Sequence, residues 1–221
     1  MNTGLTELVF VLDRSGSMRG LEKDTIDGFN KMFKKQKGSR KKVNVTTIFF
    51  DDEVEFIHDR FPIRIIRPLT KKDYFVRGCT ALLDAVGIAI EKMENVQRHL
   101  PEKHRASKVI FVIITDGLEN SSEQYTYTQI HRMIERGKER GWEFLFLGAN
   151  IDAEKEAEKI GIPKNRAVTY ENNSQGVAMN FHAVGNALSK AVQCDIAAPL
   201  FEDDWKEEIV RYRKSKGKRR D

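Results

Sequence analysis

The stretch ELVFVLDRSGSM, residues 7–18, joins a continuous apolar run to a polar loop that begins with Asp13. The stretch KVIFVIITD, residues 108–116, repeats this arrangement, because a run rich in Val, Ile and Phe closes on Asp116. Unbroken apolarity over so few residues is typical of strands that are buried on both faces of a parallel sheet. The two runs therefore predict adjacent central strands, and both aspartates are expected at the same edge of the sheet.

Helical and strand patterns alternate along the rest of the chain. Further strands are predicted at residues 43–50, 54–61, 142–148 and 167–170. Helices are predicted around Ile26, Phe29, Met32 and Phe33; Leu83, Val86, Ile90 and Met93; Ile130, Met133 and Ile134; residues 152–162; and Val177, Phe181, Val184, Leu188 and Val192. Only three residues separate the strands 43–50 and 54–61, so this pair is expected to form a hairpin. The prediction is an α/β protein with a doubly wound, mostly parallel central sheet, one antiparallel edge strand and helices on both faces.

Length and composition predict one globular domain with a terminal appendage. The chain has 221 residues, of which 40% are hydrophobic and 32% are charged. No apolar run approaches the roughly 18 residues of a membrane span. Residues 1–195 are expected to form the domain and residues 196–221 a basic, partly disordered extension, with a disordered end over residues 214–221. The N-terminus lacks the features of a secretory signal, so a cytoplasmic protein is expected.

Positive charge is concentrated in two places. The net charge is +5, and residues 205–221 carry eight basic and three acidic side chains, which is also +5. Residues 31–42 hold seven cations and no acid. This second stretch coincides with the expected end of the first helix, where cations interact favourably with the helix dipole.

The cysteines and histidines suggest no metal cluster or disulfide. Cys79 and Cys194 are far apart in sequence and give neither a zinc pair nor a disulfide framework. Cys79 is expected to be a small, buried and inert thiol, because no histidine is placed to activate it. His58 lies in the middle of an expected strand and is expected to be an exposed edge residue.

Three polar segments carry side chains that could bind a metal ion. They are DRSGS with Asp13, Ser15 and Ser17, GCT with Thr80, and TDG with Asp116. The first and third follow the two most apolar runs, and Thr80 lies near the position of an N-cap or first-turn residue of the next helix. Each residue taken alone could serve as a helix cap or turn residue, but the three loops are expected to converge.

In this order, the three segments resemble the metal-ion-dependent adhesion site of the von Willebrand factor type A (VWA) domain. The order of strands and helices from about residue 7 to about residue 192 is also similar to the Rossmann-like fold of that family. The resemblance implies that the two serines and the threonine coordinate the ion directly, while the two aspartates act partly through waters. It also implies a protein–protein interaction in which an Asp or Glu of a partner completes the coordination. An ATPase chaperone is among the partners that the resemblance implies.

Charge explains why hydroxyl groups serve as ligands. Mg²⁺ prefers six oxygen ligands and is usually held by one or two carboxylates together with several waters. Three hydroxyls and two carboxylates leave the ion electrophilic toward an incoming carboxylate. Mg²⁺ is therefore expected, with Mn²⁺ or Ca²⁺ as alternatives. Glu119, Asn120 and Ser121 are expected to form a rim that contacts the partner.

Two other functions stay open at this point. One is a magnesium-dependent phosphatase of the haloacid dehalogenase kind that uses Asp13 as its nucleophile. Ser15, however, occupies the position of the acid–base aspartate of that family, and neither a P-loop nor a Gly-x-Ser-x-Gly elbow is present, so no enzymatic activity is expected. The other is a nucleic-acid-associated protein that binds through its basic tail. No base-reading motif accompanies this tail, so a solvated end is favoured and nucleic acid is not an expected partner.

Overall fold

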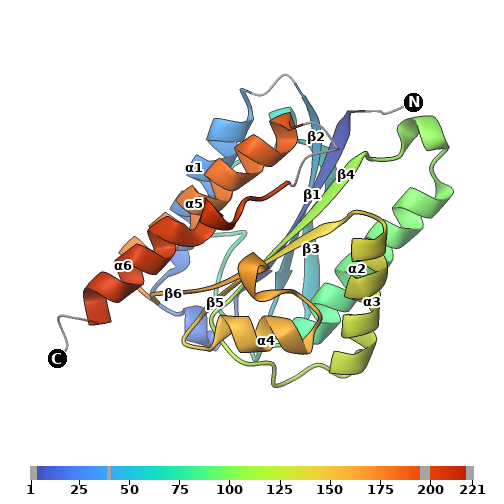
Figure 1. Cartoon of the computed structure of the whole chain (residues 1–221). Helices are drawn as coiled ribbons and strands as arrows, with labels where there is room; N and C mark the ends of the chain where they lie inside the picture. The colour runs from blue at the N-terminus through green and yellow to red at the C-terminus, as the bar shows by residue number, and fades with distance from the viewer. Residues whose placement is uncertain (1–3, 39–40, 195–199, 218–221) are drawn as a thin grey trace.

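The computed structural model describes residues 4–38, 41–194 and 200–217 of the chain (Figure 1). One sheet contains six strands in the order β3-β2-β1-β4-β5-β6, and every neighbouring pair is parallel except β2 and β3. The strands are β1 (Leu5–Asp13), β2 (Lys42–Phe50), β3 (Val54–Pro62), β4 (Lys108–Thr115), β5 (Glu143–Ala149) and β6 (Ala167–Tyr170). Strand order reverses between β1 and β4, which places the carboxyl ends of these two strands side by side.

Helices cover both faces of the sheet. They are α1 (Glu22–Gln36), α2 (Leu82–His99), α3 (Tyr127–Glu139), α4 (Ala153–Lys159), α5 (Ser174–Gln193) and α6 (Glu207–Gly217), with short 3-10 turns that include η1 (Gly16–Met18), η2 (Ile63–Ile65), η3 (Glu102–His104) and η5 (Asp203–Lys206). Helices α1, α5 and α6 lie over one face, and α2, α3 and α4 lie over the other (Figure 1). The predicted α/β fold with one antiparallel edge strand is therefore confirmed. None of the helices in the described part of the chain is long and apolar enough to cross a membrane.

Successive residues of β1 contribute to two separate apolar cores. Leu8, Phe10 and Leu12 join the core beneath α1 and α5. Val9 and Val11 join the core beneath α2 and α3. Because side chains alternate between the two faces of a strand, a strand covered on both sides has no polar positions in its centre. This explains the unbroken apolar run that the sequence shows.

The described part of the C-terminal extension packs against the domain. Phe201, Trp205 and Ile209 are buried, and the Trp205 indole Nε1 donates a hydrogen bond to the Asn165 carbonyl at 2.9 Å. Helix α6 continues through Gly217, so the disorder predicted for residues 214–221 is wrong for residues 214–217. Residues 218–221 lie outside the described part. The sequence signal for this packing is the spacing of four residues between the three apolar side chains. They cover the edge of the sheet beside β6.

Two side chains have environments that differ from the prediction. His58 was expected to be exposed, but it is 8% exposed, and its Nδ1 lies 3.0 Å from the Thr47 hydroxyl. The pairing of β2 with β3 is irregular around this position, which changes the side chain's orientation. Cys79 was expected to be buried, but it is exposed. Its backbone N–H donates to Asp52 Oδ1 at 3.0 Å, so the residue belongs to a surface loop rather than to the core.

Candidate metal centre

Three loops meet at the carboxyl ends of β1 and β4. They are the loop after β1, the loop before α2 and the loop after β4. Gly16 N–H in the first loop donates to the Gly78 carbonyl in the second at 3.1 Å, and Asn120 N–H in the third donates to the Thr80 carbonyl in the second at 3.1 Å. The predicted convergence of the three loops is therefore present in the structure.

The hydroxyl groups of the predicted ligands point into this junction. Ser15 Oγ lies 3.0 Å from Ser17 Oγ, and the Ser17 hydroxyl donates a hydrogen bond to Asp116 Oδ1. A Cβ atom built on Gly117 would lie 3.3 Å from Thr80 Oγ1 and 3.5 Å from Ser17 Oγ. The absence of a side chain at Gly117 thus leaves room beside the two hydroxyls. The structure brings these residues together as the sequence predicted.

Both predicted carboxylate ligands are buried and oriented by hydrogen bonds. Asp13 and Asp116 are each 1% exposed. Asp13 Oδ1 accepts from Ser15 N–H at 2.7 Å, and its Oδ2 accepts from the Thr115 hydroxyl at 2.6 Å. Asp116 also accepts a hydrogen bond from Asn172 Nδ2 at 3.4 Å. Each acid is therefore held in place by groups of the chain itself.

Electrostatics indicate that this junction lacks positive charge. Burial raises the pKa of Asp13, although its hydrogen bonds oppose the shift. Burial, together with the nearby charge of Asp13, raises the pKa of Asp116 to about 6. Neither carboxylate forms an ion pair with any cationic side chain of the described residues. A bound divalent cation would supply the missing charge and would favour the ionised form of both acids.

The donor set fits a small, hard cation. Hydroxyl and carboxylate oxygens are the ligand types that such cations prefer, and the cleared space beside Gly117 adjoins two of the hydroxyls. Elsewhere in residues 4–38, 41–194 and 200–217, no group of three or more His, Cys, Asp or Glu side chains could hold a metal ion. The three hydroxyls and two carboxylates are thus the best candidate for a metal centre, and their binding of an ion stays a prediction.

Two hydrogen bonds between Asn120 and Thr80 hold the third loop against the second. Asn120 Oδ1 accepts from Thr80 N–H at 2.9 Å, and the Asn120 backbone N–H donates to the Thr80 carbonyl. Helix α2 begins at Leu82 with Ala81 as its cap, so Thr80 precedes the cap and is not itself the N-cap or a first-turn residue. Both backbone groups of Thr80 are bound by Asn120 instead. We therefore assign Asn120 a positioning role toward the Thr80 hydroxyl.

Glu119 also binds within the protein. One oxygen of its carboxylate accepts from Leu83 N–H at 2.9 Å, and the other accepts from the backbone N–H groups of Ser121 and Ser122. Leu118 is 54% exposed and is the large apolar side chain that this loop presents to solvent. The partner contacts predicted for Glu119, Asn120 and Ser121 stay a prediction, because the hydrogen bonds of the first two show only their role inside the protein.

The first loop is also held by two residues that no sequence pattern pointed to, Arg14 and Tyr74. Arg14 is completely buried, and its guanidinium donates to Asp51 at 2.7 Å and to Glu55 at 2.6 Å. The Tyr74 hydroxyl donates to the Asp13 carbonyl at 2.5 Å. Burial alone would raise the pKa of the Asp51 carboxyl, but hydrogen bonds, the largest from Arg77, hold it below its usual range. Acidic residues directly after an apolar strand were the only sequence signal of this ion-pair cluster.

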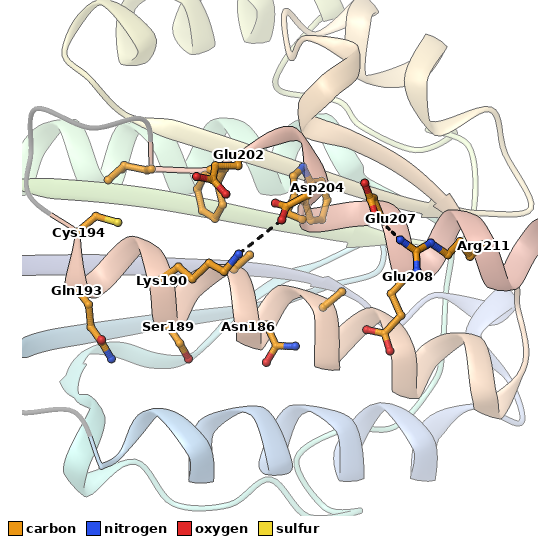
Figure 2. A pocket seen from close by; sticks show the side chains of 15 residues that line it. Asn186, Ser189, Lys190, Gln193, Cys194, Glu202, Asp204, Glu207, Glu208 and Arg211 are labelled. Carbon is orange, nitrogen blue, oxygen red and sulfur yellow. Dashed lines mark hydrogen bonds and ion pairs between the residues drawn. The ribbon is translucent and has the colours of Figure 1, made fainter.

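A hollow of about 900 Å³ lies away from the three loops, between the C-terminal half of α5 and the segment formed by η5 and α6 (Figure 2). Its charged side chains partly pair with one another, because Lys190 lies 3.6 Å from Asp204 and Arg211 pairs with Glu207. Asn172, which contacts Asp116, instead lies just before the start of α5. This hollow is therefore separate from the candidate metal centre.

Comparison with known proteins places this fold. The family model of the von Willebrand factor type A domain matches residues 7–182. The vWF domain of the type V pili tip protein Mfa5 from Porphyromonas gingivalis has a similar structure, with a TM-score of 0.62 and 12% identity over 86% of this chain and 97% of that one. Manganese-loaded TRAP protein from Plasmodium vivax gives a TM-score of 0.53 and 17% identity over 82% and 74% of the two chains.

Another similar structure is that of proximal thread matrix protein 1 from the mussel byssus, with a zinc-occupied MIDAS motif. It gives a TM-score of 0.53 and 15% identity over 83% of this chain and 46% of that one, so the chain spans about half of the mussel protein. Identities this low show the fold alone. No curated protein matches the chain. Because the family model covers most of its residues, the chain belongs to the von Willebrand factor type A domain family.

Proposed function

We propose that this protein is a metal-dependent protein-interaction module. Three hydroxyls and two buried carboxylates, contributed by Asp13, Ser15, Ser17, Thr80 and Asp116, would hold a divalent cation, and an Asp or Glu of a partner protein would complete its coordination. Membership of the VWA family supports a role in protein interaction. The observation that carries the proposal is that these groups converge on two buried acids that no cation of the described chain neutralises.

The residues of the chain have separable tasks at this centre. Ser15 N–H and the Thr115 hydroxyl orient Asp13, while Asn172 and the Ser17 hydroxyl orient Asp116. The two carboxylates offset no more than the double positive charge of the ion, and the hydroxyl ligands are neutral. A bound ion would therefore stay open to a carboxylate from a partner. The structures loaded with manganese and zinc support a divalent cation here. We propose Mg²⁺, because a small hydroxyl-rich site favours it over Ca²⁺.

The geometry disfavours a phosphatase. A nucleophilic aspartate must present a free oxygen to its substrate, but Asp13 is 1% exposed and each of its oxygens accepts a hydrogen bond. We therefore propose that the protein is not an enzyme. In the described part of the basic tail, Arg211 and Arg213 lie in ion pairs with Glu207 and Glu171, which disfavours a nucleic-acid function of α6. The ATPase chaperone partner and the cytoplasmic location stay predictions.

Titration calorimetry of the full chain with MnCl₂ and MgCl₂ tests the metal centre. The wild type should take up one ion, and Asp13→Ala and Asp116→Ala should each weaken binding by at least about tenfold, the loss typical even when only a group that orients the ligands is removed. Asp59→Ala is the matched control, because Asp59 pairs with Lys92 on the surface away from the three loops. A wild type that takes up no cation would remove the proposal.

A second experiment tests the requirement for a partner carboxylate. Proteins retained from a lysate by the immobilised wild type in Mg²⁺ should be released by chelator and should not bind Asp13→Ala. Replacing the candidate Asp or Glu of a retained partner by Asn or Gln should abolish retention. Retention that is equal with metal, with chelator and on Asp13→Ala would contradict metal-dependent recruitment.

A further inference from the structure

Exposed cations gather on α1 and on residues 67–72, a segment that hydrogen-bonds to α1. They are Lys31, Lys34, Arg67, Lys71 and Lys72, which we call the cation track. Within the described residues, none of these five side chains forms an ion pair or a hydrogen bond with another residue. Lys31 lies near Asp27, but that acid pairs with Lys23 at 2.8 Å.

The cation track is held in a fixed shape. Lys31, Lys34 and Arg67 line one groove of about 270 Å³ between α1 and the segment that follows η2. Asn30 on α1 binds both backbone groups of Leu69, because its Nδ2 donates to the Leu69 carbonyl at 2.9 Å and its Oδ1 accepts from Leu69 N–H at 2.8 Å. This double hydrogen bond keeps the segment of Arg67 against α1.

The same segment connects the groove to the candidate metal centre. Thr70 accepts hydrogen bonds from the backbone of Asp73 and Tyr74, which places Lys71 and Lys72 in a tight turn. The next residue in contact is Asp13, whose carbonyl accepts a hydrogen bond from the Tyr74 hydroxyl. The turn therefore connects the segment of Arg67 to the first ligand loop through the buried side chain of Tyr74.

Some cations of the protein are neutralised by neighbouring acids instead. On α3, Arg136 and Arg140 both pair with Glu94, and Lys138 pairs with Glu135 at 2.7 Å. Unpaired like charges repel one another, and the negative end of the helix dipole offsets this repulsion for Lys34 in the last turn of α1 but not for the three cations that lie outside the helix. The cation track has the form of a surface that receives negative charge from a partner.

We propose that the cation track binds an acidic segment of the same partner protein whose carboxylate reaches the metal centre. This inference rests on the proposed function, since both sites would attract negative charge and one segment of the chain joins them. The proposed metal centre takes a carboxylate, which a protein partner carries and a nucleic acid lacks. Phe33, the aromatic side chain of the groove, is buried, so it offers no stacking surface for a nucleobase. A protein segment rich in Asp and Glu therefore fits better than a nucleic acid.

Charge reversal on the full chain tests this inference. The probe is a fluorescein-labelled oligo-glutamate peptide, and its dissociation constant is measured by fluorescence anisotropy at rising NaCl concentrations, with Mn²⁺ or with chelator. The track variant carries Lys31→Glu, Lys34→Glu and Arg67→Glu. It should bind the peptide about tenfold more weakly or worse, because three attractions to the glutamates become repulsions. The matched control is Arg98→Glu/Lys103→Glu/Arg132→Glu, which changes the net charge equally at exposed, unpaired positions on the opposite face. The control should bind within about twofold of wild type.

The outcomes separate this inference from the proposed function. Selective loss in the track variant supports the inference whether or not chelator weakens binding. If chelator or Asp13→Ala weakens binding of the peptide while the track variant binds like wild type, the proposed function stands and the inference about the cation track is wrong. Equal losses in both triple variants would show an effect of net charge alone and also overturn it, as would no binding of the peptide. Single-stranded DNA that binds more tightly than the peptide and is lost in the same variant would assign the surface to nucleic acid instead.

Discussion

Replacing Arg14 by Met should show how strongly a buried ion pair holds the first ligand loop. Arg14 lies between Asp13 and Ser15 in sequence, is completely buried, and pairs with the equally buried Asp51 at 2.7 Å. Removing one partner of a buried pair costs about 3–5 kcal/mol, because the other charge is left without compensation. Asp51 would still be bound by Arg77 at 2.8 Å, so we expect the lower end, about 3 kcal/mol.

Urea unfolding followed by tryptophan fluorescence measures this loss in the free energy of unfolding. The reporters are Trp142 and Trp205, both buried in the folded chain. Arg77→Met is the control, because Arg77 is 43% exposed and its solvent-screened pairs should contribute much less than the buried pair. Arg14→Met should also weaken Mn²⁺ binding, since it releases the loop between the two ligands. If both variants lose the same free energy, the buried pair does not anchor the loop.

Three further predictions concern positions outside the ligand set. Asn120→Ala should cost about 1 kcal/mol of stability and weaken Mn²⁺ binding severalfold, because Thr80 N–H loses its acceptor at 2.9 Å. Unchanged Mn²⁺ affinity in calorimetry would exclude the positioning role of Asn120. Burial lowers the pKa of His58 from its ordinary 6.5, so its neutral form stabilises the fold fully above that pH, and this contribution is lost as pH falls below it. His58→Gln should therefore flatten the fall in unfolding free energy on acidification, and parallel curves for the two proteins would refute this. Gly176→Ala would place a Cβ 1.9 Å from the Glu171 carbonyl oxygen and should cost roughly 1–3 kcal/mol, measured as a lower thermal midpoint; an unchanged midpoint would show that the backbone relaxes freely.

Sequence alone determined the features that depend on local pattern. The apolar runs before Asp13 and Asp116 predicted β1 and β4 correctly, because a strand covered on both faces needs apolar residues at every central position. The hairpin of β2 and β3 followed from the short loop between them. The five candidate ligands could also be named in advance, because the three segments that carry them resemble the metal-ion-dependent adhesion site of the VWA family.

Tertiary structure alone decided which distant residues support these ligands. Arg14 and Asp51 are 37 positions apart, Thr80 and Asn120 are 40 apart, and Asp13 and Thr115 are 102 apart. These pairs form because the strand order brings separate loops to one edge of the sheet, and no local pattern encodes which side chains then meet. The burial of His58, the exposure of Cys79 and the packing of α6 escaped prediction for the same reason. Each depends on what neighbouring elements cover, which a single segment of sequence does not contain.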